Sequence, residues 1–323
     1  MSEKQFKKGD VIFREGDEGK SFYDILEGTV GIFVGYNTDS EEKLTELKPG
    51  QFFGEMAVID AYPRSATAVA LDDVKVSEVS SGEMDGYFET QPDRIVAIMK
   101  HLSSRIRILS NDYSEVTKAI QAFGKNKEAS ADGLINKLRK FANTYKHNKN
   151  ITTLDSAEAK RKIAEASHSE GYTEKVESYS KGTIIFKEGE KGNCLYDVHF
   201  GEVGIYTGYG TPDEKLLTRI GTNRFFGEMG MLDDDIRSAT AVALSDETTV
   251  EIITADDLNE LFKKNAPKVG MILAHLSYRL RSLTISCIDA CKLASDVTEA
   301  EASGSVSEDL RKKADSFEAK FYA

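Results

Sequence analysis

Two matched segments of the sequence carry the residues best suited to chemistry. Each has a glutamate in a Phe-Gly-Glu-Met segment and, nine residues later, the arginine of an Arg-Ser-Ala-Thr segment: Glu55 with Arg64, and Glu228 with Arg237. A glycine before a short helical turn exposes backbone N–H groups that can receive an anion, and an arginine in the same loop gives a phosphate a bidentate partner. A carboxylate repels a phosphate, so the glutamate is better suited to accept hydrogen bonds from hydroxyls of the same ligand. A phosphorylated sugar satisfies both demands.

A simpler interpretation is that each glutamate pairs with its own arginine and that the segment binds nothing. Many arginines form such pairs, so one copy alone would leave this interpretation open. Both residues recur in both copies together with their surroundings, and charged residues are seldom buried unless they are paired or functional. The recurrence therefore favours a binding site over a local ion pair.

The two segments lie within an internal repeat. Residues 6–73 align with residues 179–246 at a constant offset of 173 positions, without a gap and with about half of the positions identical. Each copy holds short runs of β-branched and aromatic residues separated by Gly and Asp, which is typical of a small sandwich or barrel. In the first copy these runs are Val11–Phe13, Tyr23–Leu26, Val30–Val34 and Ser65–Leu71.

Glycines stand at matched places in the two copies. We expect them to mark turns with positive φ or sharp bends of a strand, which glycine adopts without steric cost. The matched pairs are Gly9 with Gly182, Gly16 with Gly189, Gly19 with Gly192, and Gly28 with Gly201.

Helical periodicity follows each strand-rich block. Apolar residues recur at three- and four-residue steps in residues 93–122 and 267–291, which predicts amphipathic helices. Both stretches contain a matched His-Leu-Ser-X-Arg-(Ile/Leu)-Arg, at 101–107 and 275–281. The two histidines are expected to hydrogen-bond locally or to lie on the helix surface rather than to titrate as switches.

We therefore predict an α+β protein with two small β-barrel or jelly-roll domains, each with a helical tail, joined by a helical connector. The connector reads as two helices broken near residues 147–152, and its apolar positions make a plain flexible linker less suitable. After Ser303-Gly304-Ser305 an amphipathic helix is expected to pack on another surface. The predicted boundaries are 1–117 for the first domain with its lid helix, 118–175 for the connector, 176–291 for the second domain with its lid helix, and 292–323 for the tail.

Composition bounds the function classes. The formal net charge is −12 and the sequence pI is about 5.1, so the chain as a whole repels nucleic acids and anionic membranes. No apolar run is long enough to span a bilayer, and the start lacks the hydrophobic core of a signal peptide, so we expect a cytoplasmic protein without membrane contact. The three cysteines are Cys194, Cys287 and Cys291; the last two stand four residues apart, but no third or fourth Cys or His lies near them to complete a metal site.

At this point the sequence resembles a known family. The segments FGEMAVIDAYPRSATAVA and FGEMGMLDDDIRSATAVA are similar to the phosphate-binding cassette of cyclic nucleotide-binding domains, as in catabolite-activator proteins, regulatory subunits of cAMP-dependent protein kinase and cyclic-nucleotide-gated channels. The resemblance covers about two thirds of the chain. It implies a receptor that binds cAMP, or cGMP, without a metal or catalysis.

The resemblance also implies roles for individual residues. The glutamates would take the ribose 2′-hydroxyl, the arginines the cyclic phosphate, and the helical tails would act as lids over the base. Candidates to cap the base are Ser110 and Tyr113 in the first unit and Thr284 in the second. The residues implied at the two sites are Gly54, Glu55, Met56, Ala57, Arg64, Ser65 and Ala66, and Gly227, Glu228, Met229, Gly230, Arg237, Ser238 and Ala239.

The second cassette differs from the first just before its arginine. It has Asp234-Asp235-Ile236 where the first has Ala61-Tyr62-Pro63. A carboxylate about 8 Å from a phosphate costs a few tenths to about 2 kcal/mol at effective dielectrics of 80 to 20. We therefore predict weaker nucleotide binding at the second site.

Several related functions are less suitable. The stretch after residue 285 is acidic and lacks wing strands or a basic recognition helix, so DNA binding is not expected. The first unit begins at residue 6, so we do not expect inhibition of a kinase through a segment before that unit. A tandem receptor that moves its connector and C-terminal helices against a protein partner is preferred. The alternatives are an interaction scaffold that binds no nucleotide and an adaptor whose helices oligomerise.

Overall fold

The computed structural model describes residues 2–39, 41–59, 63–91, 93–125, 132–148, 175–232 and 236–317. The chain forms two compact units, each built from separate stretches of sequence. Unit 1 comprises Met1–Met84, Leu109–Leu154 and Leu283–Ala319, and unit 2 comprises Asp85–Ile108, Asp155–Ser282 and Lys320–Ala323. The predicted domain boundaries at 117, 175 and 291 divide the chain into consecutive segments, whereas these units group residues that are close in space. The boundaries therefore stay predictions.

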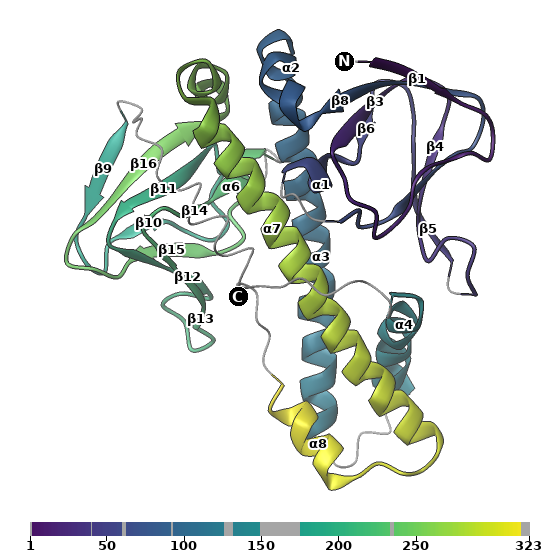
Figure 1. Ribbon diagram of the computed structural model, residues 1–323. Coiled ribbons are helices and arrows are strands. Elements are labelled where there is room, and N and C mark those ends of the chain that lie inside the picture. Colours follow the sequence, from purple (N-terminus) through teal and green to yellow (C-terminus); the bar gives the residue numbers. More distant parts are fainter. Residues whose placement is uncertain are drawn as a thin grey trace. The chain divides into compact units, whose positions relative to one another are not determined.

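The first β domain consists of two four-stranded antiparallel sheets, with strand orders β1-β8-β3-β6 and β2-β7-β4-β5 (Figure 1). Apolar residues of both sheets, among them Ile25, Val30, Ala68 and Val76, form its core. All four runs predicted from the sequence are strands. The strands are β1 (Ser2–Phe6), β2 (Val11–Phe13), β3 (Ser21–Glu27), β4 (Val30–Val34), β5 (Glu42–Leu47), β6 (Phe52–Phe53), β7 (Thr67–Ala70) and β8 (Val74–Ser80).

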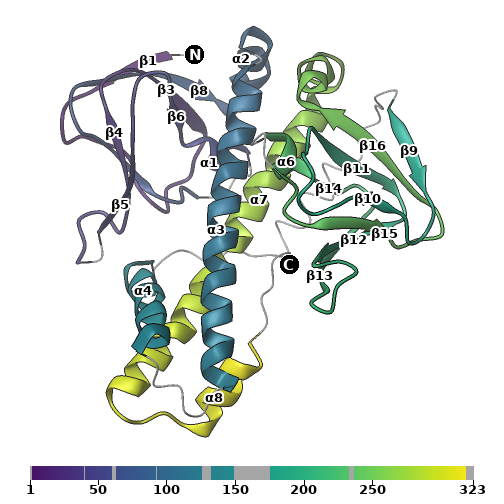
Figure 2. The same ribbon diagram turned by 180° about the vertical axis from the view of Figure 1, so that it is seen from behind.

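The second β domain repeats this topology, with strand orders β9-β16-β11-β14 and β10-β15-β12-β13 (Figure 2). In both domains the eight strands form two separate sheets and a jelly-roll-like fold, so the α+β prediction is confirmed and a closed barrel is not formed. The strands are β9 (Val176–Tyr179), β10 (Ile184–Phe186), β11 (Cys194–Phe200), β12 (Glu202–Thr207), β13 (Lys215–Gly221), β14 (Phe225–Phe226), β15 (Thr240–Ala243) and β16 (Thr248–Thr254).

Short helices begin at the two glutamates of the cassettes, and long helices follow the sheets. The short ones are α1 (Glu55–Ile59) and α6 (Glu228–Leu232). The others are the 3-10 turn η1 (Ser81–Glu83), α2 (Met84–Thr90), α3 (Asp93–Lys125), α4 (Asp132–Asn148), α7 (Ala255–Ala302) and α8 (Glu308–Asp315). In the described part of the chain, none of these helices combines the length and apolarity needed to cross a bilayer.

The apolar stripes predicted from the sequence are buried. In unit 2 the first part of α3 buries Ile95, Ile98, Met99, Leu102 and Ile106, and α7 buries a similar stripe from Val269 to Leu280. Both helices are longer than the predicted stretches 93–122 and 267–291: α3 ends at Lys125, and α7 runs from Ala255 to Ala302. The predicted connector boundary at 118 therefore falls inside a helix. The second predicted connector helix lies outside the described residues.

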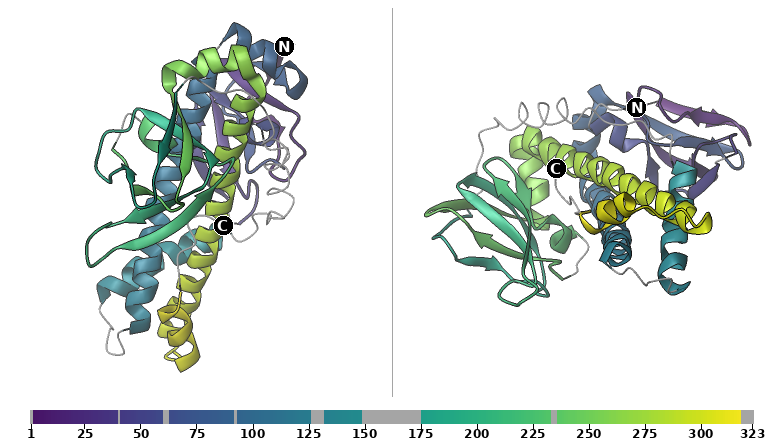
Figure 3. Two further views of the ribbon diagram at one scale, coloured as in Figure 1. Left: turned by 90° about the vertical axis from the view of Figure 1, so that its left-hand side faces the viewer. Right: turned by 90° about the horizontal axis from the view of Figure 1, so that it is seen from below.

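The C-terminal amphipathic segment forms α8 and packs on the end of α3 within unit 1 (Figure 3). Arg311 donates a hydrogen bond to the Phe123 carbonyl at 3.3 Å, and Gln121 donates to the Phe317 carbonyl at 2.7 Å. A Cβ on Gly124 would lie 2.2 Å from the backbone nitrogen of Asp315, so only glycine permits this approach. The predicted break is present, because α7 ends at Ala302 and Gly304 has φ of +65°.

Candidate functional site

Arg64 of the first β domain lies in a polar and aromatic socket. Its Nη1 and Nη2 atoms donate hydrogen bonds to the carbonyls of Gly54 and Ser21, both at 2.6 Å. The guanidinium carbon lies 4.2 Å from the centre of the Phe13 ring. Burial lowers the pKa of Arg64 from its usual value, but an arginine this basic stays charged. The buried Nε of Arg64 has no hydrogen-bond partner among the described residues.

Arg237 of the second β domain has the same surroundings. Its Nη1 atom donates to the Gly227 carbonyl at 2.5 Å and to the Cys194 carbonyl at 3.0 Å, and its guanidinium carbon lies 4.2 Å from the centre of the Phe186 ring. The buried Nε of this residue is also unpartnered within the described chain. Both cassette arginines therefore donate to backbone carbonyls rather than to the cassette glutamate, and each retains a buried donor for an anion.

Two glycines make room for these arginines. A Cβ on Gly19 would lie 2.9 Å from the Arg64 guanidinium carbon, and a Cβ on Gly192 would lie 2.8 Å from that of Arg237. Neither glycine has a positive φ, whereas the other six glycines of the four matched pairs do. The expectation of a positive φ is therefore wrong for Gly19 and Gly192. These two are small because a charged side chain packs against them.

The cassette glutamates begin α1 and α6 and are buried, with 4% of Glu55 and 2% of Glu228 exposed. Glu228 forms an ion pair with Arg279 of α7, whose Nη2 atom also lies 3.5 Å from the Met229 sulfur. A second arginine reaches the same segment, because Arg107 of α3 donates to the Met229 carbonyl at 3.0 Å. Neither arginine was predicted at the site from the sequence, although both belong to the matched Arg-X-Arg of the helical tails.

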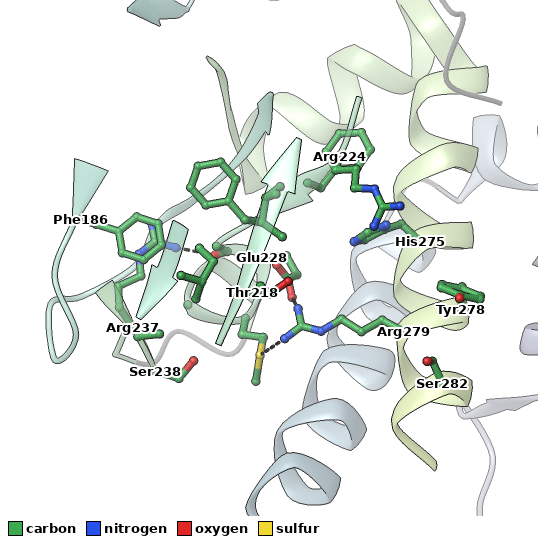
Figure 4. A pocket seen from close by; sticks show the side chains of 18 residues that line it. Phe186, Thr218, Arg224, Glu228, Arg237, Ser238, His275, Tyr278, Arg279 and Ser282 are labelled. Carbon is green, nitrogen blue, oxygen red and sulfur yellow. Dashed lines mark hydrogen bonds and ion pairs between the residues drawn. The ribbon is translucent and has the colours of Figure 1, made fainter. Parts of the chain in front are cut away.

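A pocket in unit 2 brings the second cassette together with α7 (Figure 4). All seven residues expected at the second site line it: Gly227, Glu228, Met229, Gly230, Arg237, Ser238 and Ala239. Four residues of α7 line the opposite wall, namely His275, Tyr278, Arg279 and Ser282. The strands and their connections supply Phe186, Ile205, Thr218, Ile220, Arg224, Phe225 and Phe226. Cationic and hydroxyl groups thus converge on an aromatic floor, which suits an anionic ligand with a flat apolar part.

His275 is a neutral member of this pocket at pH 7. Burial lowers its pKa to about 4, and its ring packs edge-on against Phe225 with the ring centres 6.0 Å apart. A neutral imidazole can donate and accept one hydrogen bond each. The residue therefore adds hydrogen-bonding capacity to the pocket without adding charge.

The predicted base caps lie on the two long helices, Ser110 and Tyr113 on α3 and Thr284 on α7. Thr284 is not among the residues that line the pocket, where Tyr278 and Ser282 of the same helix are found instead. Tyr113 is buried in unit 1, with 2% of the residue exposed, and its carbonyl accepts a hydrogen bond from Thr117. Ser110 is half-buried on the same helix. Helix geometry explains why Thr284 is absent from the lining. Residues 275, 278, 279 and 282 lie on one face of α7, and residue 284 lies on another face.

The first cassette has the same local arrangement within unit 1. Met56, Ala57 and Ala66 are buried beside Glu55 and Arg64, and Gly54 has φ of +82°. Ser65, like Ser238, is exposed. The residues expected at the first site therefore lie on one connection between β6 and β7.

A buried cluster of charges lies apart from the pocket lining in unit 2. Lys268 of α7 forms ion pairs with Asp197, at 3.0 Å, and with Glu251, and His199 lies 3.1 Å from Glu251. The side-chain atoms of the two carboxylates and the histidine are close enough for a metal ion. Lys268 and a protonated His199 together balance the two carboxylates, and these carboxylates raise the pKa of His199 to about 9, so this set is better suited to an internal ion-pair network than to a metal.

Comparison with known proteins identifies relatives. A family model described as cyclic nucleotide-binding domain matches residues 3–91 and 176–265, more than half of the chain. A cAMP-dependent protein kinase regulatory subunit of Debaryomyces hansenii is 29% identical over 245 residues, which cover 76% of this chain and 41% of the relative. That of Candida albicans is 28% identical over 246 residues, covering 76% and 40%. The chain thus spans less than half the length of these curated relatives.

A solved structure gives a weaker comparison. The regulatory domain of Toxoplasma gondii PKA with cAMP is 17% identical and covers 83% of this chain and 82% of its own, with a TM-score of 0.27. A score this low carries no argument about function. The assignment depends on the two family matches.

Proposed function

Because the chain belongs to the cyclic nucleotide-binding domain family and carries that domain twice, we propose that it is a non-catalytic receptor that binds one cyclic mononucleotide at each cassette. The observation that carries this proposal is the buried arginine with an unpartnered Nε, which occurs in the same socket in both domains. A buried cation with a spare donor favours an anionic ligand, since it stays charged and its hydrogen-bonding capacity is incomplete.

We assign each part of the ligand to particular residues. Arg64 and Arg237 hold the cyclic phosphate, and Glu55 and Glu228 accept a hydrogen bond from the ribose 2′-hydroxyl. In the second site the base lies between the strands and α7, near Tyr278 and Ser282, which line the pocket. No metal or other cofactor takes part.

The ligand we favour is cAMP over cGMP, as in the names of the curated relatives. Binding transmits to a protein partner through the long helices, because α7 supplies one wall of the pocket and differential affinity for two helix positions would shift their populations. A kinase catalytic subunit is a candidate partner, because the curated relatives are named as regulatory subunits of cAMP-dependent protein kinase. The cytoplasm is the proposed compartment.

Titration calorimetry of the full chain, stripped of ligand by unfolding and refolding, tests the proposal with cAMP and cGMP separately. Arg64→Ala and Arg237→Ala should each weaken one site by at least about tenfold to a hundredfold, because a charge-assisted contact of about 1.5 to 3 kcal/mol is lost. Two sites, one sensitive to each variant, would support the receptor. If neither nucleotide binds, the scaffold interpretation is favoured.

The same titration tests whether the second site is weaker. The aspartates behind that prediction, Asp234 and Asp235, lie outside the described residues. Equal or tighter binding at the second site would contradict it.

A further inference from the structure

The second pocket contains an ion pair that joins the cassette to the helix forming its far wall. Glu228 begins α6, and its carboxylate Oε1 accepts a hydrogen bond from Nη1 of Arg279, which lies 51 residues later on α7 (Figure 4). The side chains are buried, with 2% of Glu228 and 11% of Arg279 exposed. The arginine is thus held at the position where the proposed function places the ribose.

A carboxylate in this position meets two electrostatic costs. It is buried, and a buried charge without a partner is strongly unfavourable. The proposed ligand also brings a phosphate into the same pocket, and two negative charges repel each other. A cation on Glu228 reduces both costs. Arg237 does not supply it in this structure, because its Nη1 atom donates to the carbonyls of Gly227 and Cys194 and its Nη2 atom faces the Cys194 sulfur.

The geometry leaves Glu228 able to bind a ligand as well. An ionised carboxylate has two oxygens and about four acceptor sites, and Arg279 occupies Oε1. No other hydrogen bond to this carboxylate is present within the described residues, so Oε2 can accept from a hydroxyl. The neighbouring His275 has its pKa lowered to about 4 by burial and adds no positive charge at pH 7.

We propose that Arg279 is a positioning residue of the second nucleotide site: it compensates the charge of Glu228 and orients that carboxylate toward the ribose 2′-hydroxyl. The inference rests on the proposed function and extends it, since it assigns the ribose contact to a pair of residues on two elements. It also makes occupancy of the site sensitive to the position of α7.

The test uses the full chain with the first site silenced by Arg64→Ala, so that calorimetry with cAMP reports the second site alone. Arg279→Met should weaken binding by about tenfold to a hundredfold, in the range of a lost hydrogen bond between charged groups. Arg219→Met is the matched control, because Arg219 pairs with Glu202 on the surface of the same β domain. It should bind as the parent does.

Two further measurements separate positioning from a merely structural role. Glu228→Gln combined with Arg279→Met should bind more tightly than Arg279→Met alone, because it removes the uncompensated carboxylate. The ratio of affinities for cAMP and 2′-deoxy-cAMP should fall toward one in Arg279→Met, since a misoriented Glu228 no longer recognises the hydroxyl. A loss of packing would lower both affinities together and would leave this ratio unchanged.

Each outcome decides the inference. Parent-like affinity in Arg279→Met, or an unchanged ratio with no rescue by Glu228→Gln, overturns it while the proposed function stands. Failure of the Arg64→Ala chain to bind cAMP or cGMP overturns the proposed function at this site and the inference with it. If Arg279→Met does not fold, Arg279→Gln removes the charge but keeps an amide donor, and the same loss and the same change of ratio are expected.

Discussion

In the first β domain the pairing of β3 with β8 sets Asp24 opposite Ser77, whereas in the second the pairing of β11 with β16 sets Asp197 opposite Glu251. Two residues after these aspartates, the first domain has the exposed Leu26 and the second has His199. Lys268 of α7 completes the cluster in the second domain. The arginine sockets are alike in the two copies, whereas Lys268 ties a sheet of the second domain to its following helix through buried charges.

We expect this difference to affect the stability of the second domain more than its ligand binding. The cluster in the second domain sets two carboxylates against a lysine and a histidine, so its charges balance when the histidine is protonated. Replacing such a network by apolar groups can be neutral, but removing one member leaves a buried charge without compensation. The comparison therefore predicts a helix anchor in the second domain that is sensitive to single substitutions.

Lys268→Met should have the largest effect. It leaves Asp197 and Glu251 buried together, and we expect a loss of about 3 to 5 kcal/mol in the free energy of unfolding of the second domain. Denaturant unfolding followed by hydrogen exchange in β11 and β16 would measure it. Lys263→Met on the same helix is the control, because Lys263 pairs with Glu260 on the surface and such pairs contribute about 0 to 1 kcal/mol. Similar losses in both variants would contradict the anchor.

Gly19→Ala and Gly192→Ala test whether the two arginine sockets depend on glycine in the same way. In each case the new Cβ displaces the cassette arginine, and overpacking costs about 1 to 3 kcal/mol of stability together with affinity at that site. Gly19→Ala should be the more severe, since the new Cβ would lie 2.3 Å from the Ala57 Cβ, where the second domain has Gly230. Gly82→Ala and Gly221→Ala, which face open space, are the controls. Calorimetry and thermal unfolding would report both quantities, and unchanged affinity would contradict the socket.

The pH dependence of stability should distinguish the two domains by a smaller amount. Hydrogen bonds with Asp197 and Glu251 raise the pKa of His199 to about 9. A raised pKa stabilises the folded state fully below the unfolded value of about 6.5, and this contribution is lost as the pH rises through 9. Since His199 is only half-buried, we expect about 1 to 2 kcal/mol. His199→Gln should flatten the unfolding free energy of the second domain between pH 6.5 and 9.5, and a parent-like slope would contradict this.

The sequence predicted the parts of the molecule that are determined by local pattern. Periodicity and residue spacing are properties of the sequence itself. They therefore predicted the strands, the buried helical stripes and the cassette residues around Arg64 and Arg237. The period-2 signal fails for β6, which has two residues, and the helices extend beyond the stretches with clear apolar periodicity, because α3 ends at Lys125 and α7 spans Ala255–Ala302.

The remaining contacts depend on tertiary proximity. Arg279 lies 51 residues from Glu228, and Arg107 lies 122 residues from Met229. No local spacing rule relates such positions, although a matched motif placed the arginines on helices. Gly19 and Gly192 were recognised as unusual positions, but their reason is a side chain 45 residues away in each copy. The sequence thus predicts which residues belong to the candidate site, whereas the residues that support them are found only in the folded structure.

The docking of α8 on α3 has a consequence for synthesis of the chain. The sheets of the first β domain need only residues up to Ser80, so they can form while the ribosome continues. The end of α3 needs Arg311, which follows Phe123 by 188 residues. At about 5 to 20 residues per second, translation covers this interval in roughly 10 to 40 s. The α8-binding end of α3 therefore stays without α8 while the whole second β domain is made, and unit 1 cannot complete its fold before that domain has been synthesised, although it contains the first residues.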